Sequence, residues 1–361
     1  MIEKTSSFSR FLVVTAAFVI VVTGLKMAGP LLVPFLLAVF VAMIVSPVLS
    51  WLKSYRLPSS LAIFLVVALV FSVGLLLAAV IGSSVDNFRQ DIPVYSAKLS
   101  MMSGSIQQWL SQRGISIDAE QWSSSFDPGA VMGVVGTTLA SFGNVMTNAV
   151  MILITVIFIL AENVSFGEKL RSATGSNNSQ QWLRTFSDSV HSYLAIKAAI
   201  SLLTGFIIFV WLTVLGVDYA VLWGLIAFLL NFIPTVGSFI AAVPAVLLAL
   251  VQLGVFEASL TLAGFVVVNM VMGSVLEPRW MGRGLNLSPL VVFVSLVLWG
   301  WVLGPVGMLL SIPLTIMLKI ALESQSDTRW IGVMLGAGGV LDTDAKVPQE
   351  PKLAAPKDSK G

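Results

Sequence analysis

The stretch "NFIPTVGSFIAAVPAV" (residues 231–246) lies in one of the most apolar parts of the chain, yet it is rich in residues that weaken a helix. It carries Asn231, Pro234, Thr235, Gly237 and Ser238 within eight positions. Inside a bilayer, backbone amides and carbonyls freed by a helix break must be satisfied by protein or by a water-filled cavity. If the chain lies in a membrane, this stretch therefore predicts an interruption that faces protein, water or a transported solute.

The composition indicates a membrane protein. Apolar residues make up 57% of the 361 residues, charged residues only 11%, and the mean hydropathy is +0.95. Soluble domains have about 25% charged residues. A net charge of +2 gives no reason to expect a nucleic-acid partner, and the absence of cysteine excludes disulfides, thiolate metal sites and cysteine nucleophiles.

The pattern of apolar segments predicts an all-α integral membrane protein with about eight membrane segments. A bilayer crossing needs about 20 apolar residues. Six stretches approach that length: 11–29, 31–51, 61–82, 144–161, 198–215 and 256–276. Two others, 219–251 and 289–320, are split by Gly and Pro into halves that are short for a crossing, so we expect re-entrant hairpins. A pair of full spans is the alternative for each, and it leaves the sidedness unchanged.

These segments divide the chain into four regions. Residues 1–82 form the N-terminal three spans, and residues 83–143 form an extracytoplasmic insert of short amphipathic helices, with the spacing of Ile106, Trp109 and Leu110 as the main evidence. Residues 144–323 form the transport core, and residues 324–361 form a disordered cytoplasmic tail, most clearly from Ala337 onward.

The distribution of basic residues predicts the orientation. With the N-terminus inside, the outer segments hold only Lys26, Arg89, Lys98 and Arg113 of the 20 lysines and arginines. Cytoplasmic loops carry an excess of these residues, so both termini are expected in the cytoplasm.

The polar residues at the breaks are the candidate solute pathway. Transporters use half-helix ends and unwound backbone to meet substrate near the midplane. The first break offers Asn231, Thr235 and Ser238, shaped by Pro234 and Gly237, and Asn269 follows in the next span. The second break, "WGWVLGPVGMLLSIP" (299–313), adds Gly304, Pro305 and Ser311. The alternative is a packing kink without a ligand, because Gly and Pro are common in membrane helices.

Three ionisable residues near span ends, Glu162, Lys197 and Glu277, are candidates for ion coupling. The alternatives are snorkelling to the inner interface for Glu162 and Lys197, and an ion pair between Glu277 and the nearby Arg279. The sequence has no HExxH, GxSxG or GxxxxGK[ST] motif, so we expect no enzyme activity, cofactor or metal site.

Two long motifs carry a family resemblance. "VLWGLIAFLLNFIPTVGSFIAAVPAVLLALVQ" (221–252) and "LEPRWMGRGLNLSPLVVFVSLVLWGWVLGPVGMLLSIPLTIMLK" (276–319) resemble the autoinducer-2 exporter family of bacterial inner-membrane proteins. The resemblance implies export of autoinducer-2, a small polyhydroxylated quorum-sensing signal, by a homo-oligomer, with a pentamer as the expected form. Some relatives resemble sodium or lithium/proton antiporters, so the resemblance leaves the substrate open.

Three functions are therefore weighed. The leading hypothesis is an exporter of a small polar metabolite, with autoinducer-2 first, because the groups at the breaks are mainly neutral amides and hydroxyls. The second is a cation/proton antiporter that uses Glu277 or Glu162. The third is a membrane scaffold that recruits partners through the insert or the tail.

Overall fold

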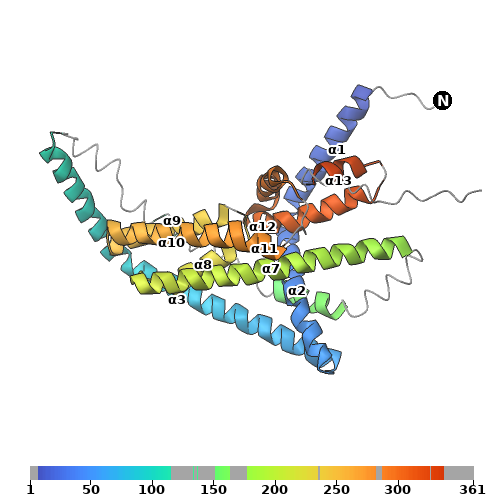
Figure 1. Ribbon diagram of the computed structural model, residues 1–361, viewed down its shortest axis with the longest axis horizontal. Helices are drawn as coiled ribbons and strands as arrows, with labels where there is room; N and C mark the ends of the chain where they lie inside the picture. The colour runs from blue at the N-terminus through green and yellow to red at the C-terminus, as the bar shows by residue number, and fades with distance from the viewer. Residues whose placement is uncertain are drawn as a thin grey trace, which may run out of the picture.

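A computed structural model describes residues 7–114, 133, 136, 151–162, 177–234, 236–281, 287–325 and 327–336. Every regular element among these residues is a helix, as predicted (Figure 1). In chain order they are α1 (Ser7–Met27), α2 (Gly29–Ser54), α3 (Ser59–Gln112), an apolar helix Met151–Glu162, α7 (Asn177–Leu215), α8 (Ala220–Leu230), α9 (Val236–Gln252), α10 (Val255–Asn269), the π-helix η1 (Met270–Leu276), α11 (Glu277–Met281), α12 (Pro289–Glu323) and α13 (Arg329–Met334).

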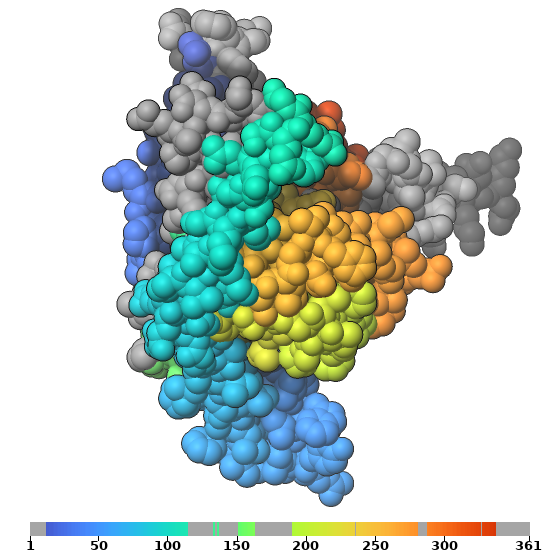
Figure 2. Space-filling model, turned by 90° about the vertical axis from the view of Figure 1, so that its left-hand side faces the viewer, coloured from blue at the N-terminus to red at the C-terminus, as the bar shows by residue number. Residues whose placement is uncertain are grey.

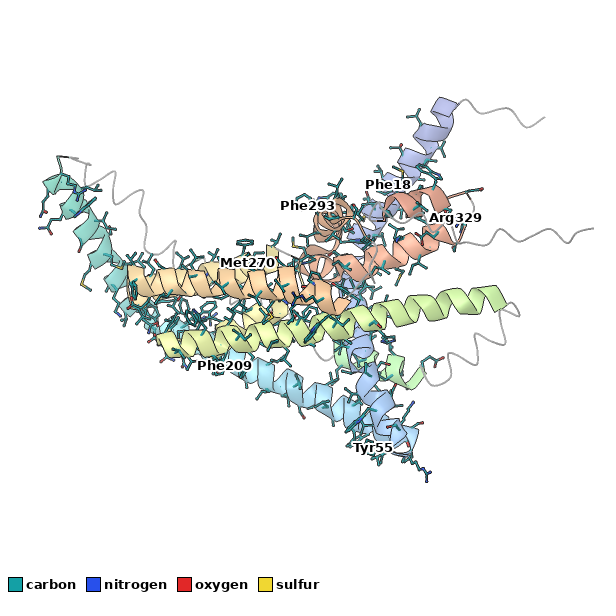
Figure 3. All side chains as sticks on the ribbon, viewed as in Figure 1. Phe18, Tyr55, Phe209, Met270, Phe293 and Arg329 are labelled. Atoms are coloured by element: carbon teal, nitrogen blue, oxygen red, sulfur yellow. The ribbon has the colours of Figure 1, made fainter. Side chains whose placement is uncertain are left out.

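Five helical segments in the described part are long and apolar enough to cross a membrane. They are Gly29–Ser54, Ser59–Gln112, Val190–Leu215, Val255–Trp280 and Pro289–Glu323. Their apolar side chains face outward: only 6% of the most apolar window of α3 is buried within the molecule. Met270 and Phe293 are among the side chains that point away from the bundle (Figure 3). Such an apolar surface would aggregate in water and is suited to lipid.

The N-terminal helices pack through small and β-branched residues. Ala38 and Ala42 of α2, Ala62 and Val66 of α3, and Val156 of the helix Met151–Glu162 form one fully or almost fully buried cluster. Hydrophobicity does not drive helices together in lipid, so close van der Waals contact at small residues holds them instead. Within the predicted span 144–161 the structure describes the short apolar helix Met151–Glu162, and residues 144–150 lie outside the described residues.

The third span does not end where the sequence predicts. We expected a separate set of short helices from residue 83, but α3 continues without a break to Gln112. Its 54 residues correspond to about 80 Å, well beyond the roughly 30 Å of a bilayer core. Pro93 does not stop the helix, and the polar residues after position 82 lie on an exposed helix instead of in loops. Figures 1 and 2 show this extension (cyan to teal) alongside the ends of α7 and α10 and projecting past them.

Helices α7 to α10 form the central bundle (Figure 1). Gly205 of α7 and Gly224 of α8 face one another so closely that a Cβ on Gly205 would lie 2.6 Å from the Gly224 carbonyl oxygen. Trp211 of α7 packs directly on Gly264 of α10, and its indole Nε1 donates to the Leu260 carbonyl at 3.1 Å. Glycines thus let three helices approach one another at backbone distance.

The first broken segment is a helical hairpin, as predicted. Its arms are α8 and α9, and the chain is non-helical from Asn231 to Pro234. Its two outer ends meet, because the Gln252 side chain at the end of α9 accepts from the Asp218 amide at 2.8 Å and donates to the Gly216 carbonyl at 3.0 Å. The arms measure about 16 and 25 Å, so each is shorter than a bilayer core.

The second broken segment, α12, is also a hairpin. Gly304 has φ 68° and ψ −153°, and the chain reverses there. The Thr315 hydroxyl donates to the Ser295 hydroxyl at 2.7 Å, although residues 20 apart in a straight helix would be separated by about 30 Å. The segment Pro289–Glu323 has enough residues for a crossing, but it is folded in two at Gly304. Neither arm has the length of the whole segment.

The C-terminal tail begins later than predicted. Residues 324–361 were expected to be disordered, but α13 folds back on α12, with Gly332 against Glu323. Gly332 is the buried residue of α13 and allows this short helix to lie directly against α12, which the composition of the whole tail does not reveal. Residues 337–361 lie outside the described residues.

Candidate transport site

The first break forms at two residues that follow α8. Asn231 caps the helix with its amide bonded to the Ala227 carbonyl, and Pro234 has no amide hydrogen to continue the ladder. Thr235 lies outside the described residues. The Asn231 side chain is 7% exposed, and its Nδ2 donates to the Ser201 hydroxyl of α7 at 2.9 Å. The break is thus tied to α7 by a buried contact between neutral polar groups.

Gly237 acts differently from our expectation. It was predicted to permit the turn, but it lies inside α9 and is not among the glycines with positive φ. A Cβ at this position would collide with the Leu230 carbonyl oxygen at the end of α8. Gly237 therefore permits the close approach of the two arms rather than an unusual backbone conformation.

The second arm of the hairpin is tied to α10. The Ser238 hydroxyl donates to the Asn269 side-chain carbonyl Oδ1 at 2.8 Å. Asn269 is the last residue of α10, directly before the π-helix η1. π-Helices are rare and are frequently found at functional sites. The predicted pathway residue Asn269 therefore lies beside an irregular element that no sequence signal showed.

Lys197 and Glu277 form a bidentate ion pair across the bundle. The Lys197 Nζ lies 2.8 Å from both Glu277 carboxylate oxygens. The Lys197 side chain is 3% exposed and that of Glu277 is 20% exposed. The alternatives considered from sequence were wrong, because Lys197 does not snorkel to the surface and the partner of Glu277 is not Arg279. Lys197 belongs to α7, and Glu277 is the first residue after η1.

The pair and the break share one face of α7. Lys197 and Ser201 are four residues apart, so their side chains lie one above the other on the helix. Ser201, which the sequence analysis did not single out, therefore connects the ion pair with Asn231. Its four-residue spacing from Lys197 was the one available signal.

The second break contributes shape rather than exposed polar groups. Gly304 makes the reversal, Pro305 begins the second arm, and Gly307 packs against the Trp299 carbonyl. The Ser311 hydroxyl donates to the Met308 carbonyl of its own helix at 2.7 Å, so it is occupied within the arm. Phe232 of the first break and Leu310 and Ile312 of the second hairpin belong to the same buried apolar cluster.

Glu162 lies elsewhere. It ends the helix Met151–Glu162, which packs on α2 and α3, and its side chain is exposed. The structure therefore places two of the three candidate ion-coupling residues together and the third in a different helix group.

Residues 12–327 match the family described as AI-2E family transporter, which covers nearly all of the described helices. The chain belongs to the AI-2E family. It is therefore a multi-pass membrane transporter and not a member of an enzyme family.

Several AI-2E relatives match over nearly their whole length. The chain is 38% identical to the AI-2 transport protein TqsA of Escherichia coli K12 over 327 residues, covering 90% of this chain and 95% of TqsA. It is 38% identical over 343 residues to a putative transport protein of Haemophilus influenzae, covering 92% and 98%. It is 34% identical to the putative transport protein YhhT of E. coli K12, covering 90% and 93%.

A second polar cluster of this AI-2E chain holds the base of the first hairpin against the α3 extension. The Tyr95 hydroxyl donates to Asp218 at 2.8 Å, Tyr219 donates to Asp91, and the Lys98 ammonium donates to the Gln252 carbonyl at 3.3 Å. Burial raises the pKa of the Tyr219 hydroxyl above its usual value, and the bond to Asp91 raises it further, so the phenol stays a donor. The sequence analysis missed this cluster because its members are more than 100 residues apart.

Proposed function

We propose that this protein exports a small polar metabolite and that autoinducer-2 is the substrate. The observation that carries the substrate is the 38% identity with the AI-2 transport protein TqsA over 95% of its length. The groups around the first break fit a polyhydroxylated solute, because Asn231, Ser201, Ser238 and Asn269 offer amide and hydroxyl donors and acceptors without net charge.

In this proposal the solute replaces the contacts that now close the break. The Asn231–Ser201 and Ser238–Asn269 bonds each join one arm of the hairpin to a different helix, α7 or α10. A solute hydroxyl can take over either bond without leaving a buried polar group unpaired, which would cost about 1–3 kcal/mol. Thr235 and Ser311 complete the proposed pathway, and Pro234, Gly237, Gly304 and Pro305 keep the two breaks in shape.

The remaining parts of the proposal concern the assembly and its setting. We infer a homo-oligomer, with a pentamer as the expected form, in the bacterial inner membrane with both termini cytoplasmic. The distribution of lysine and arginine supports the orientation.

Measurement of extracellular autoinducer-2 in cells with and without the gene tests the substrate. We expect a lower ratio of external to internal signal in the deletion strain, and recovery with the intact gene. Asn231→Ala and Ser238→Ala should reduce recovery. The matched control is Ser259→Ala, because the Ser259 hydroxyl donates to the Val255 carbonyl of its own helix and lies on the exposed face of α10. Equal ratios in all strains would refute the assignment.

The Lys197–Glu277 pair supports a second candidate, a sodium or lithium/proton antiporter of the same family. A buried carboxylate within a membrane can bind a proton and a cation in turn. Everted vesicles loaded with a pH-sensitive dye would respond to added sodium or lithium if this function is correct. An unchanged dye signal across the pH range tested would exclude it.

A further inference from the structure

The π-helix η1 is held at both ends by polar contacts that come from different helices. Asn269, just before it, accepts from Ser238 of α9, and Glu277, just after it, accepts from Lys197 of α7. Only the seven residues Met270–Leu276 separate the two contact points. A change in the charge of Glu277 can therefore affect the Ser238–Asn269 contact through the short π-helix η1.

The two members of the ion pair differ in burial within the protein. The Glu277 side chain is 20% exposed, whereas that of Lys197 is 3% exposed. The carboxylate is therefore the member at the edge of the bundle, while the ammonium has to find its partners inside the protein. The nearest candidate along α7 is Ser201, whose hydroxyl oxygen is the acceptor of the Asn231 bond.

We propose that Glu277 is the proton-binding switch of the transporter and that Lys197 transmits its state to the first break. When water supplies a proton to the Glu277 carboxylate, the pair changes from zero net charge to +1 and no bond other than the ion pair is lost. A buried ammonium without a partner is strongly unfavourable, so Lys197 moves one helical turn towards the Ser201 hydroxyl. This contact competes with Asn231 and loosens the break.

The release of Glu277 also frees the end of η1. The π-helix then no longer has to satisfy Lys197 at one end and Ser238 at the other, so the Ser238–Asn269 contact loses its fixed geometry. Both arms of the hairpin thus respond to a single protonation. This inference rests on the proposed function, because there the hairpin break is the solute pathway.

Other ionisable groups surround the switch. Tyr193 and His191 lie on α7, four and six residues before Lys197, and Arg279 lies on α11, two residues after Glu277. Arg279 is exposed and its charge is screened by water. His191 is half-buried and lies on the same helix as Lys197, so the test by pH uses a His191→Gln background.

The natural absence of cysteine allows a direct test that needs no substrate. In the full-length His191→Gln protein, Val236→Cys places one thiol at the start of α9, beside the break and outside the hydrogen bonds described above. The rate of labelling by a water-soluble maleimide, corrected for thiolate fraction, is measured between about pH 4 and pH 7. We expect labelling to rise several-fold on acidification.

Variants of the pair decide whether Glu277 causes this change. Glu277→Gln, which imitates the protonated state, should show fast labelling without pH dependence, and Lys197→Arg, which retains the pair, should preserve the pH dependence. Equal labelling at every pH in the protein with the intact pair would overturn the proposal. So would an unchanged pH dependence in Glu277→Gln.

A transport assay separates the failure of the switch from the failure of the proposed function. The full-length protein in liposomes is given autoinducer-2 with and without an imposed proton gradient. We expect the gradient to stimulate transport, and Glu277→Gln to lose this stimulation while downhill movement continues. Downhill transport that ignores the gradient in the unaltered protein would overturn the switch alone, whereas absence of any autoinducer-2 movement, with pH-dependent labelling intact, would overturn the substrate alone.

Discussion

At the scale of single residues, the Lys197–Glu277 pair is the most sensitive point of the molecule. Removal of one member of a buried pair leaves an uncompensated charge and typically costs about 3–5 kcal/mol, while removal of both often costs little. We expect Lys197→Met to lower thermal stability in detergent strongly and Lys197→Met with Glu277→Gln to recover most of the loss. Equal losses in the single and double variants would show that the two side chains are not energetically coupled.

Gly237 gives a second residue-scale prediction. Gly237→Ala places a methyl group against the Leu230 carbonyl, so the arms of the hairpin must separate. We expect lower thermal stability and loss of export. The matched control is Gly74→Ala in α3, where a new Cβ meets nothing within 4 Å and the better helix propensity of alanine stabilises by up to about 1 kcal/mol. Similar effects of the two substitutions would contradict the close-approach role.

At the scale of elements, the α3 extension fixes the base of the first hairpin. Two tyrosine–aspartate bonds and one lysine–carbonyl bond join it to the turn before α8 and to the end of α9. A hydrogen bond to a charged group contributes about 1.5–3 kcal/mol. We expect Tyr95→Phe with Tyr219→Phe to increase hydrogen exchange in residues 91–98 and 216–219, with little change in α2. Unchanged exchange would show that apolar packing alone holds the extension.

The same elements show how far the sequence could predict this structure. Both hairpins were predicted, because Pro, Gly and Asn in an apolar run are locally incompatible with a continuous helix in lipid, and the pathway role of Asn231, Ser238 and Asn269 stays a prediction. The π-helix, the partner of Lys197 and the length of α3 were not. The first two depend on contacts between residues distant in sequence, and the third on tertiary support for a polar helix after residue 82.

At the scale of the whole molecule, the two hairpins define two opposite ends. The base of the first lies at residues 216–219 and 252, beside residues 91–98 of α3, which are about 48 Å or more along the helix from Ser59. The base of the second lies near Ser288 and α13, since the Ser288 amide bonds to the Leu335 carbonyl. If the N-terminal part of α3 crosses the bilayer, the base of the first hairpin lies on the side of the membrane opposite to Tyr55 and the loop before α3.

Single cysteines introduced into the cysteine-free chain can test this sidedness. Ser105→Cys on the α3 extension, Ser54→Cys at the end of α2 and Ser324→Cys at the end of α12 are exposed positions, and each replaces an oxygen by a sulfur with little steric change. We expect a membrane-impermeant maleimide to label Ser105→Cys in intact cells, and to label the other two only after the membrane is permeabilised. Long loops obey charge rules weakly, but positions 54 and 324 lie at helix ends, where lysine and arginine determine orientation. Labelling of Ser54→Cys and Ser324→Cys from opposite sides would mean that the chain crosses the membrane an odd number of times between them, and the solute pathway between the breaks would then have to be redrawn.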